Sequence, residues 1–215
     1  MESRAESFGL ASSVIRYFIL HISLPRPAVC LSEMDILNLY RETGAYLEGH
    51  FLLASGRHSP KFLQSTTVVQ YPQHAETIGA ALAQKLNDTL DTVPSFVLGP
   101  AMGGVVLAHT TAKALGCRAL FAEKDGQGGM KIREAFEIKE GETFIAVEDV
   151  VTTGGSLQKS IDAAEAEGGT CVGVGCIIDR GTAEMDLTAL QTLSFPTYPA
   201  DACPLCAEGV PLEDI

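Results

Sequence analysis

The segment from residue 143 to residue 167 reads TFIAVEDVVTTGGSLQKSIDAAEAE and decides the expected fold. Its apolar start, FIAV at 144–147, is short and rich in β-branched and aromatic residues, which predicts a buried strand. Two carboxylates, Glu148 and Asp149, follow directly. Beyond a polar loop, apolar residues recur at helical spacing, namely Leu157, Ile161 and Ala164. The predicted order is therefore strand, acidic pair, loop and helix.

The loop between the acidic pair and the helix has the composition of a phosphate-binding loop. Its small residues are Thr152, Thr153, Gly154, Gly155 and Ser156. Glycines let backbone N–H groups converge, the helix that follows presents its positive end, and hydroxyls add donors. The neighbouring carboxylates would repel a phosphate, because they can only accept hydrogen bonds or hold a cation. The expected ligand therefore carries a phosphate at one end and hydroxyls or a metal at the other, as a sugar phosphate does.

Nine consecutive residues here resemble the phosphoribosyl pyrophosphate (PRPP) signature of the type I phosphoribosyltransferases, and specifically of the orotate phosphoribosyltransferase family. They are Glu148, Asp149, Val150, Val151, Thr152, Thr153, Gly154, Gly155 and Ser156. The resemblance implies that the acidic pair contacts the ribose hydroxyls of PRPP and that the loop binds its 5-phosphate. The segment matches neither the P-loop pattern GxxxxGK[ST] nor the dinucleotide pattern GxGxxG. A strand-to-helix turn with incidental acids is the disfavoured alternative.

The composition indicates one soluble globular domain with an acidic surface. The 215 residues are 46% hydrophobic and carry a formal net charge of −12. A chain of this length supports one core of ordinary size, with room for a small appended subdomain. The negative charge argues against nucleic acid or an anionic membrane surface as the main partner. An anionic substrate must therefore be held by local donors and a metal.

Six cysteines are scattered along the chain, and the close pair is Cys203 and Cys206 in the sequence CPLC. A zinc site needs about four ligands. The sequence shows no second CxxC and no paired histidines, so a metal here would need a partner subunit or the distant Cys117, Cys171 or Cys176. A disulfide or redox role is a further alternative, and a reduced turn near the C-terminus is the favoured one.

Residues 1–32 differ from the rest of the chain and are expected to form an extension with no role in the chemistry. A targeting peptide is the less favoured alternative. The apolar run within this segment is far shorter than the ~20 residues that a membrane span needs.

The next portion, about residues 33–70, is expected to form a small hood beside the main sheet. Ser32 with Asp35 predicts the capped start of a helix, which Gly44 ends. Strands are expected from residue 46 to residue 70, around a turn that contains a glycine.

From Pro72 onward, helical and strand patterns alternate. Strands are expected at residues 95–98, 117–121 and 170–178, in addition to the one before the acidic pair. Such alternation predicts an α/β fold, with a parallel sheet, helices on both faces and ligands at the carboxyl ends of the strands. The resemblance implies the type I phosphoribosyltransferase fold, whose central sheet is mostly parallel and flanked by helices. One domain, 33–215, is expected, with a hood of about 33–70 plus the C-terminal tail and a core of about 71–190.

A second glycine loop, at residues 99–104, follows a predicted strand and opens a helix, so its N–H groups can hold a second anion. A tight turn is the alternative. In the resembled family this loop binds pyrophosphate, which implies PRPP contacts from Met102 and Gly103. Gly103 replaces a lysine that better-known members of the family carry.

Arg180 ends a predicted buried strand at the ligand edge, where a cation is costly unless an anion meets it. Its planar fork suits a carboxylate. The resemblance implies that Arg180 and Thr152 bind orotate and that Phe62 packs against the planar base. The alternative for Arg180 is an ordinary salt bridge with Asp179 or Asp186.

The sequence SGRHSPKF at residues 55–62 resembles the hood segment of the family, which shapes the orotate and ribose region. Ala54 replaces the lysine that usually precedes it, so no phosphate contact is expected there. His58 either faces the site or is a surface histidine of the turn.

The polar, glycine-rich sequence FAEKDGQGGMKIREAF at residues 121–136 is expected to form a mobile flap. In the family such a loop closes over the site, often across a dimer interface. Lys124 matches one family lysine, whereas Glu123 stands where an arginine is usual, and a later lysine and histidine are absent. Lys131 and Arg133 could substitute for them, and a solvated hairpin is an equally favoured interpretation.

The resemblance implies an orotate phosphoribosyltransferase, which converts orotate and PRPP to orotidine 5′-phosphate and pyrophosphate in pyrimidine (UMP) synthesis. Glu148, Asp149 and Lys124 are the implied catalytic residues. The implied cofactor is Mg²⁺, held mainly by substrate, with Asp149 as the one candidate ligand from the protein. A cytoplasmic homodimer is expected, with no nucleic-acid or membrane partner. The open alternatives are a phosphoribosyltransferase for another base, which Arg180 disfavours, and a non-catalytic PRPP-sensing regulator.

Overall fold

The computed structural model describes residues 35–53, 55–90 and 92–213. The extension predicted at residues 1–32 lies outside the described residues, and so does Ser32. Within the described ranges, no helix has the length and apolar character needed to cross a membrane.

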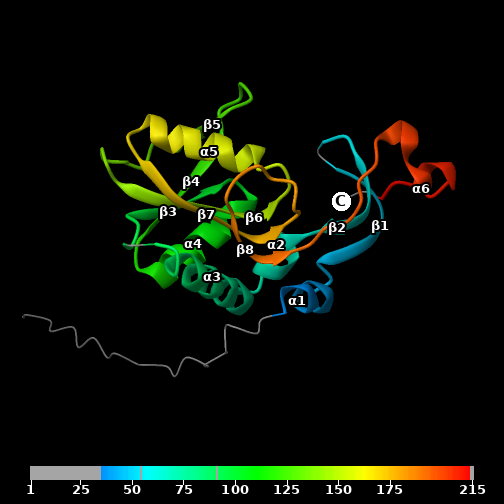
Figure 1. Cartoon of the computed structure of the whole chain (residues 1–215), viewed down its shortest axis with the longest axis horizontal. Helices are drawn as coiled ribbons and strands as arrows, with labels where there is room; N and C mark the ends of the chain where they lie inside the picture. The colour runs from blue at the N-terminus through cyan, green and yellow to red at the C-terminus, as the bar shows by residue number, and fades with distance from the viewer. Residues whose placement is uncertain (1–34, 54, 91, 214–215) are drawn as a thin grey trace, which may run out of the picture.

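The centre of the molecule is a six-stranded sheet with the order β5-β4-β3-β6-β7-β8 (Figure 1). The strands are β3 (Phe96–Pro100), β4 (Arg118–Lys124), β5 (Met130–Ile132), β6 (Thr143–Val151), β7 (Thr170–Asp179) and β8 (Thr188–Thr192). All neighbours are parallel except β4 and β5, which form an antiparallel hairpin. The α/β fold with a mostly parallel sheet is therefore confirmed.

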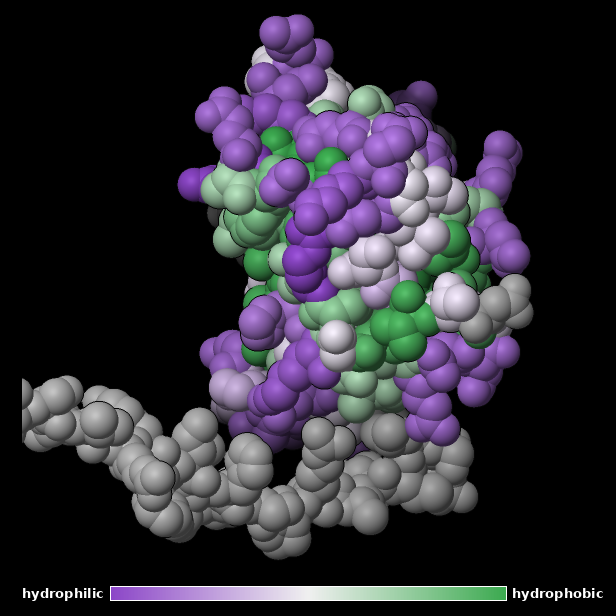
Figure 2. All heavy atoms as spheres, turned by 90° about the vertical axis from the view of Figure 1, so that its left-hand side faces the viewer, coloured by the Kyte–Doolittle hydropathy of each residue, from purple (hydrophilic) through white to green (hydrophobic). Residues whose placement is uncertain are grey.

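Helices cover both faces of this sheet. Helices α3 (Pro72–Asn87) and α4 (Gly103–Leu115) lie on one face and α5 (Gly155–Ala166) on the other (Figure 1). Alternate residues of the strands serve the two faces: Val97 and Ile145 pack in the α3 and α4 core, whereas Leu98 and Ala146 pack in the α5 core. In Figure 2, hydrophilic residues cover most of the upper part of one side of the molecule, and apolar residues occupy a smaller area.

The N-terminal portion, which we call the hood together with the C-terminal tail, contains an antiparallel hairpin of β1 (Tyr46–Leu52) and β2 (His58–Leu63). Helix α1 (Ile36–Glu42) precedes it and begins one turn later than the capping pattern predicted. Its N-cap is Asp35, whose side chain accepts a hydrogen bond of 2.9 Å from the backbone N–H of Asn38.

One predicted strand region is wrong, because residues 65–69 form a short helix, α2 (Ser65–Val69), and not a strand. The stretch is rich in β-branched residues, which favour strands. Tertiary contacts decide otherwise. The hydroxyl groups of Tyr40 and Ser65 lie 2.9 Å apart in a buried hydrogen bond, and Val68 is fully buried in the core. The helix therefore joins α1 to the main domain.

The C-terminal tail returns from β8 to the hood. It contains a short 3₁₀ helix, η2 (Ala200–Ala202), and a one-turn helix, α6 (Pro204–Ala207), which lies beside β1 and β2 in Figure 1. Tyr198 and His58 exchange two backbone hydrogen bonds of 2.8 Å, and the N–H of Glu213 donates to the carbonyl of His50. The tail therefore packs against the hairpin of β1 and β2.

Candidate active site

The acidic pair and the phosphate-type loop lie where the sequence placed them, at the carboxyl end of β6. Glu148 and Asp149 lie in the second half of the strand, and the loop runs directly into α5. Gly154 is the N-cap of α5 with a φ of 77°, a left-handed conformation that favours glycine. The free N–H groups at the start of α5 can donate hydrogen bonds to a phosphate.

The acidic pair lies in a poorly solvated environment. Burial raises the pKa of Glu148 to about 7, and the charge of Asp149 adds to the effect. On the neighbouring strand β7, Cys176 lies opposite Glu148. Burial raises the pKa of the Cys176 thiol to about 12, so this neighbour is also poorly solvated. A partner that donates hydrogen bonds or carries positive charge would stabilise the ionised pair, as ribose hydroxyls or Mg²⁺ would.

The second glycine loop lies directly against the acidic pair. The N–H of Ala101 donates to the carbonyl of Ala122, the Ala101–Met102 peptide bond is cis, and Met102 is 80% exposed at the start of α4. A Cβ atom added to Gly103 would lie only 2.8 Å from Oδ1 of Asp149. The structure therefore brings the residues predicted to bind pyrophosphate and ribose together at one edge of the sheet.

Arg180 lies beside the same edge, because its N–H donates to the carbonyl of Val151 at 2.8 Å. Its side chain is buried, with the residue only 8% exposed, and burial lowers the pKa of the guanidinium. Nε donates to the carbonyl of Leu193 and Nη2 to that of Phe195, each at 3.1 Å, and the guanidinium lies over the Phe195 ring.

The alternative interpretation of Arg180 as an ordinary salt bridge is wrong. Within residues 35–53, 55–90 and 92–213, no carboxylate forms an ion pair with it. Asp179 instead accepts a hydrogen bond from the N–H of Gly181. Arg180 is thus a desolvated cation at the ligand edge without an anionic protein partner among these residues, which suits an anionic ligand.

The two other residues predicted for orotate lie in different surroundings. Thr152 is exposed, and its carbonyl accepts a hydrogen bond of 2.9 Å from the hydroxyl of Thr182, which keeps it next to the Arg180 segment. Phe62 lies in β2 of the hood, and its ring centroid is 5.9 Å from that of Phe51. The contacts of the described residues do not test the role of Phe62.

The flap region forms a tight hairpin of β4 and β5. Glu123 forms ion pairs with both cations that could replace the missing flap residues, at 3.7 Å to Lys131 and 3.1 Å to Arg133. Lys124 is exposed and forms no ion pair within the part of the chain that the structure describes. Lys159 of α5 donates to the carbonyl of Gly128 and so ties the hairpin to the helix. Lys124 is therefore the flap cation with an unengaged charge.

The surroundings of His58 and of the CPLC cysteines bring together residues that the sequence did not connect. His58 neither faces the sheet edge nor lies at the surface, since it is 5% exposed and its ring contacts His50. The CPLC cysteines also have histidine neighbours, which the sequence analysis did not find: Cys203 and Cys206 are free thiols beside both rings. Spacing gave no signal, because the two histidines are eight residues apart on separate strands.

Comparison with known proteins agrees with this geometry. Residues 66–196 match the family model described as phosphoribosyl transferase domain. The chain is 56% identical over 186 residues to an orotate phosphoribosyltransferase of Thermus thermophilus, covering 85% of this chain and 100% of that protein. It is 48% identical over 195 residues to an orotate phosphoribosyltransferase of Deinococcus radiodurans, covering 86% of this chain and 100% of that protein.

Solved structures show the same fold. The crystal structure of orotate phosphoribosyltransferase from Aeropyrum pernix aligns with a TM-score of 0.61 at 25% identity, over 74% of this chain and 93% of that one. An adenine phosphoribosyltransferase from Leishmania tarentolae aligns with a TM-score of 0.55 at 17% identity, over 74% and 88% of the two chains, which shows the fold alone. The chain belongs to the phosphoribosyltransferase family and, within it, to the orotate phosphoribosyltransferases, which are glycosyltransferases of pyrimidine biosynthesis.

Proposed function

We propose that this chain transfers the phosphoribosyl group of PRPP to orotate and releases orotidine 5′-phosphate and pyrophosphate. The observation that carries the choice of base is Arg180, a buried guanidinium without a carboxylate partner among the described residues, next to the PRPP loop. A guanidinium in this position suits the carboxylate of orotate, and a neutral base offers no such group.

The two glycine loops supply the PRPP site. The N–H groups at the start of α5 bind the 5-phosphate, and Thr152, Thr153 and Ser156 add hydroxyl donors. Met102 and Gly103 at the start of α4 contact the pyrophosphate. Glu148 and Asp149 accept hydrogen bonds from the ribose hydroxyls. The contact between Gly103 and Asp149 supports this arrangement, since it brings the pyrophosphate and ribose subsites together.

The carboxylate of Asp149 fits a role as a ligand of Mg²⁺, because it lies against the pyrophosphate loop and offers the hard oxygen donors that this cation prefers. Mg²⁺, held mainly by PRPP, would neutralise charge on the departing pyrophosphate. Glu148 and Asp149 stabilise the positive charge that grows on the ribose ring as the bond to pyrophosphate breaks.

Orotate is held in position for attack on the ribose by three residues. Arg180 binds its carboxylate, and Thr152 fixes its orientation from the adjacent loop. Phe62 of the hood packs against the planar ring. Lys124 reaches the pyrophosphate from the end of β4, where its ammonium group has no ion pair among the described residues. No covalent intermediate with the protein is needed.

The assembly and location proposed here follow the family pattern. The flap of this chain closes over the site across a dimer interface, so the active form is a homodimer. The enzyme acts in the cytoplasm. The hairpin of β4 and β5, which projects beyond the sheet in Figure 1, supports this role for the flap.

Turnover of orotate tests the function. Purified protein is mixed with PRPP, Mg²⁺ and orotate, and the loss of orotate absorbance is followed, with hypoxanthine, adenine and uracil assayed in parallel. Turnover of orotate alone is expected. Tight binding of PRPP without turnover of any base would favour the sensor alternative instead.

The role of Arg180 is tested by the variant Arg180→Ala. This change should abolish orotate turnover and leave PRPP binding nearly intact, because the phosphate loops do not depend on the guanidinium. Equal loss of orotate turnover and PRPP binding would contradict the assignment of Arg180 to the base.

A further inference from the structure

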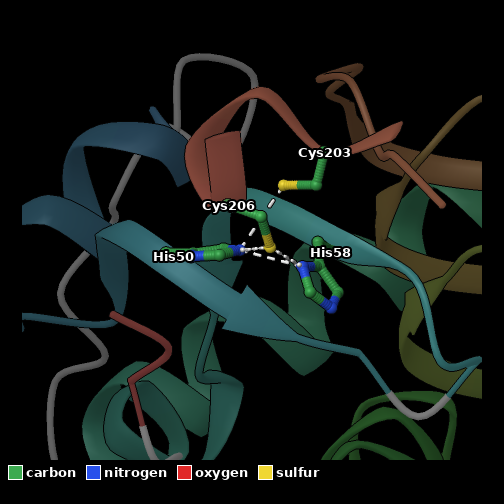
Figure 3. A group of neighbouring side chains, drawn as sticks. All are labelled: His50, His58, Cys203 and Cys206. Atoms are coloured by element: carbon green, nitrogen blue, oxygen red, sulfur yellow. Dashed lines mark hydrogen bonds between the residues drawn. The ribbon is translucent and has the colours of Figure 1, made fainter. Parts of the chain in front are cut away.

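Four potential metal ligands meet in the hood, on elements other than those that carry Glu148, Asp149 and Lys124. They are His50, His58, Cys203 and Cys206, and their ligand atoms all lie within 4.8 Å of one another. Figure 3 shows the two rings and the two thiols pointing toward one another. Nε2 of His50 lies 2.9 Å from Nδ1 of His58, and Sγ of Cys206 lies 3.3 Å from the same Nδ1.

The backbone builds this cluster from three separate segments. His50 lies in β1 at a register shift between Glu48 and Phe51, and His58 begins the partner strand β2. A bulge of this kind redirects side chains. Cys203 is the N-cap of α6, and Cys206 lies one turn later. The bridge between His58 and Tyr198 holds the tail against the hairpin, so the convergence does not depend on a single rotamer.

Hydrogen bonds among the four side chains cannot satisfy all of their polar atoms. Nδ1 of His50 lies 2.7 Å from the carbonyl oxygen of Val210, which can only accept, so Nδ1 carries the hydrogen and Nε2 presents one lone pair. That lone pair faces three groups: Nδ1 of His58 at 2.9 Å, Sγ of Cys203 at 3.4 Å and Sγ of Cys206 at 3.7 Å. One lone pair cannot serve three donors, whereas one cation can bind all four atoms.

We propose that His50, His58, Cys203 and Cys206 form a structural Zn²⁺ site. A tetrahedral zinc ion places two nitrogen ligands about 3.3 Å apart and a nitrogen and a sulfur about 3.5 Å apart. The two nitrogens lie 2.9 Å apart and three nitrogen–sulfur pairs lie 3.3 to 3.7 Å apart, close to these values. All four ligand atoms lie within 4.8 Å of one another, so side-chain rotations can complete the tetrahedron. Two soft thiolates and two imidazoles select zinc over Mg²⁺ or Ca²⁺.

The surroundings fit a closed structural site. The carbonyl of Val210 orients the His50 ring, as outer partners of zinc-bound histidines do. His50, His58 and Cys203 are buried, and two thiolates would neutralise the ion, which lowers the cost of burying it. Cys206 is exposed and provides a route for the ion from solvent. With four protein ligands no position remains open for a substrate, so the site is not catalytic.

The hood has a structural need for such a site. Part of the hood belongs to the main core cluster, through Ile36, Tyr40, Ala45, Leu63 and Val68. The part that carries the four ligands does not, because no residue from 47–53, 55–62 or 197–213 belongs to either core cluster of the described chain. Small units without their own core are commonly held by a metal. The zinc ion would fasten both hood strands to the tail and add the binding energy of the metal to the folding of this unit.

The first test is the metal content of the full-length protein, purified without an affinity tag or chelator and kept in a non-thiol reductant. About one zinc ion per chain is expected, as for a site with four ligands. Replacement by Co²⁺ should give the intense visible bands of tetrahedral cobalt and a thiolate-to-cobalt charge-transfer band. A chelator should lower the thermal midpoint of unfolding.

The variant Cys206→Ser separates binding from folding, because Cys206 is exposed and a serine disturbs no packing. It should retain less than about one fifth of the bound zinc and lose the cobalt spectrum, since metal affinity requires the thiolate. Cys117→Ser is the matched control, because Cys117 is a free cysteine outside the cluster, and it should bind zinc like the wild type.

Three results would overturn the proposal. Equal zinc content in the wild type and Cys206→Ser would place the metal elsewhere. Absence of both zinc and a cobalt spectrum in the reduced wild type would exclude a metal site in the hood. A disulfide between Cys203 and Cys206 that forms in protein supplied with one equivalent of zinc, with no metal bound, would assign the pair a redox role.

Discussion

The guanidinium carbon of Arg180 lies 3.3 Å from the centroid of the Phe195 ring. Two guanidinium nitrogens donate to the carbonyls of Leu193 and Phe195 in the same segment. Two residues further along, Thr197 accepts two hydrogen bonds from Arg57 of the hood. The tail therefore positions the proposed base-binding arginine and also holds the hood hairpin.

This arrangement predicts a specific defect in Phe195→Leu. Leucine preserves an apolar contact but removes the ring face, and a desolvated cation–π contact is worth roughly 1–2 kcal/mol. The KM for orotate should rise about tenfold while the KM for PRPP stays nearly constant, because a factor of ten corresponds to about 1.4 kcal/mol. Steady-state kinetics with each substrate varied in turn would measure both constants.

Phe195→Tyr is the matched control, since it retains the aromatic ring and should behave like the wild type. A similar rise of both KM values in Phe195→Leu would indicate a general disturbance of the site and would contradict the positioning role of the ring.

The contact between Gly103 and Asp149 predicts the effect of Gly103→Ala. The new methyl group would lie 2.8 Å from Oδ1 of Asp149, so the carboxylate must turn away. Alanine at the first position of α4 is otherwise well tolerated. We expect PRPP affinity in the presence of Mg²⁺ to fall several-fold, measured by calorimetry, with little change in the thermal midpoint.

A double-mutant cycle checks this explanation. In an Asp149→Asn background the carboxylate is already lost, so adding Gly103→Ala should weaken PRPP binding little further. Fully additive losses would show that the alanine acts on the loop and not through Asp149.

The environment of Glu148 predicts how stability varies with pH in the free protein. Its pKa is raised from 4.5 to about 7 in the folded state, mainly by burial. Between these values the folded protein keeps a proton that the unfolded chain has lost, so the free energy of unfolding falls as pH rises. Above about pH 7 both states are ionised and the destabilisation is complete.

Glu148→Gln removes this ionisation. The variant should be more stable than the wild type at pH 8, by at most about 3 kcal/mol, and nearly equal to it at pH 4. Urea unfolding of both proteins without substrate or Mg²⁺, at several pH values, measures the difference. Parallel pH profiles of the two proteins would contradict a raised pKa at Glu148.

The sequence predicted the sheet edge well because its signals are local. The acidic pair, the loop and the helix that follow β6 are consecutive, so each fixes the position of the next. Arg180 was placed correctly for a similar reason: a charge at the end of an apolar strand falls at the same edge as the other strand ends. Its true partner, the Phe195 ring, lies fifteen residues away and gives no signal in the pattern.

The hood was predicted less well because its contacts join distant segments. A β-branched stretch at residues 65–69 became helical through the contact of Ser65 with Tyr40, which no local propensity shows. His50 meets His58 across the hairpin, at a register shift between Glu48 and Phe51. The two cysteines come from the C-terminal tail, far away in the sequence. The contact between these histidines and cysteines depends on the three-dimensional path of the tail, which the sequence pattern does not show.

The flap provides the last prediction, a comparison between Lys124→Ala and Lys131→Ala. Both lysines belong to the β4–β5 hairpin, but Lys131 pairs with Glu123 at 3.7 Å, whereas Lys124 has no ion pair in the described chain. A free ammonium group can meet charge that develops on pyrophosphate, and losing such an interaction costs roughly a factor of ten or more in kcat. Lys124→Ala should show that loss in pre-steady-state and steady-state rates, and Lys131→Ala should stay within about twofold of the wild type, as expected for an exposed pair. If Lys131→Ala lost as much activity as Lys124→Ala, the Glu123 pair would have to break during turnover, and the flap would close in a different conformation from the hairpin described here.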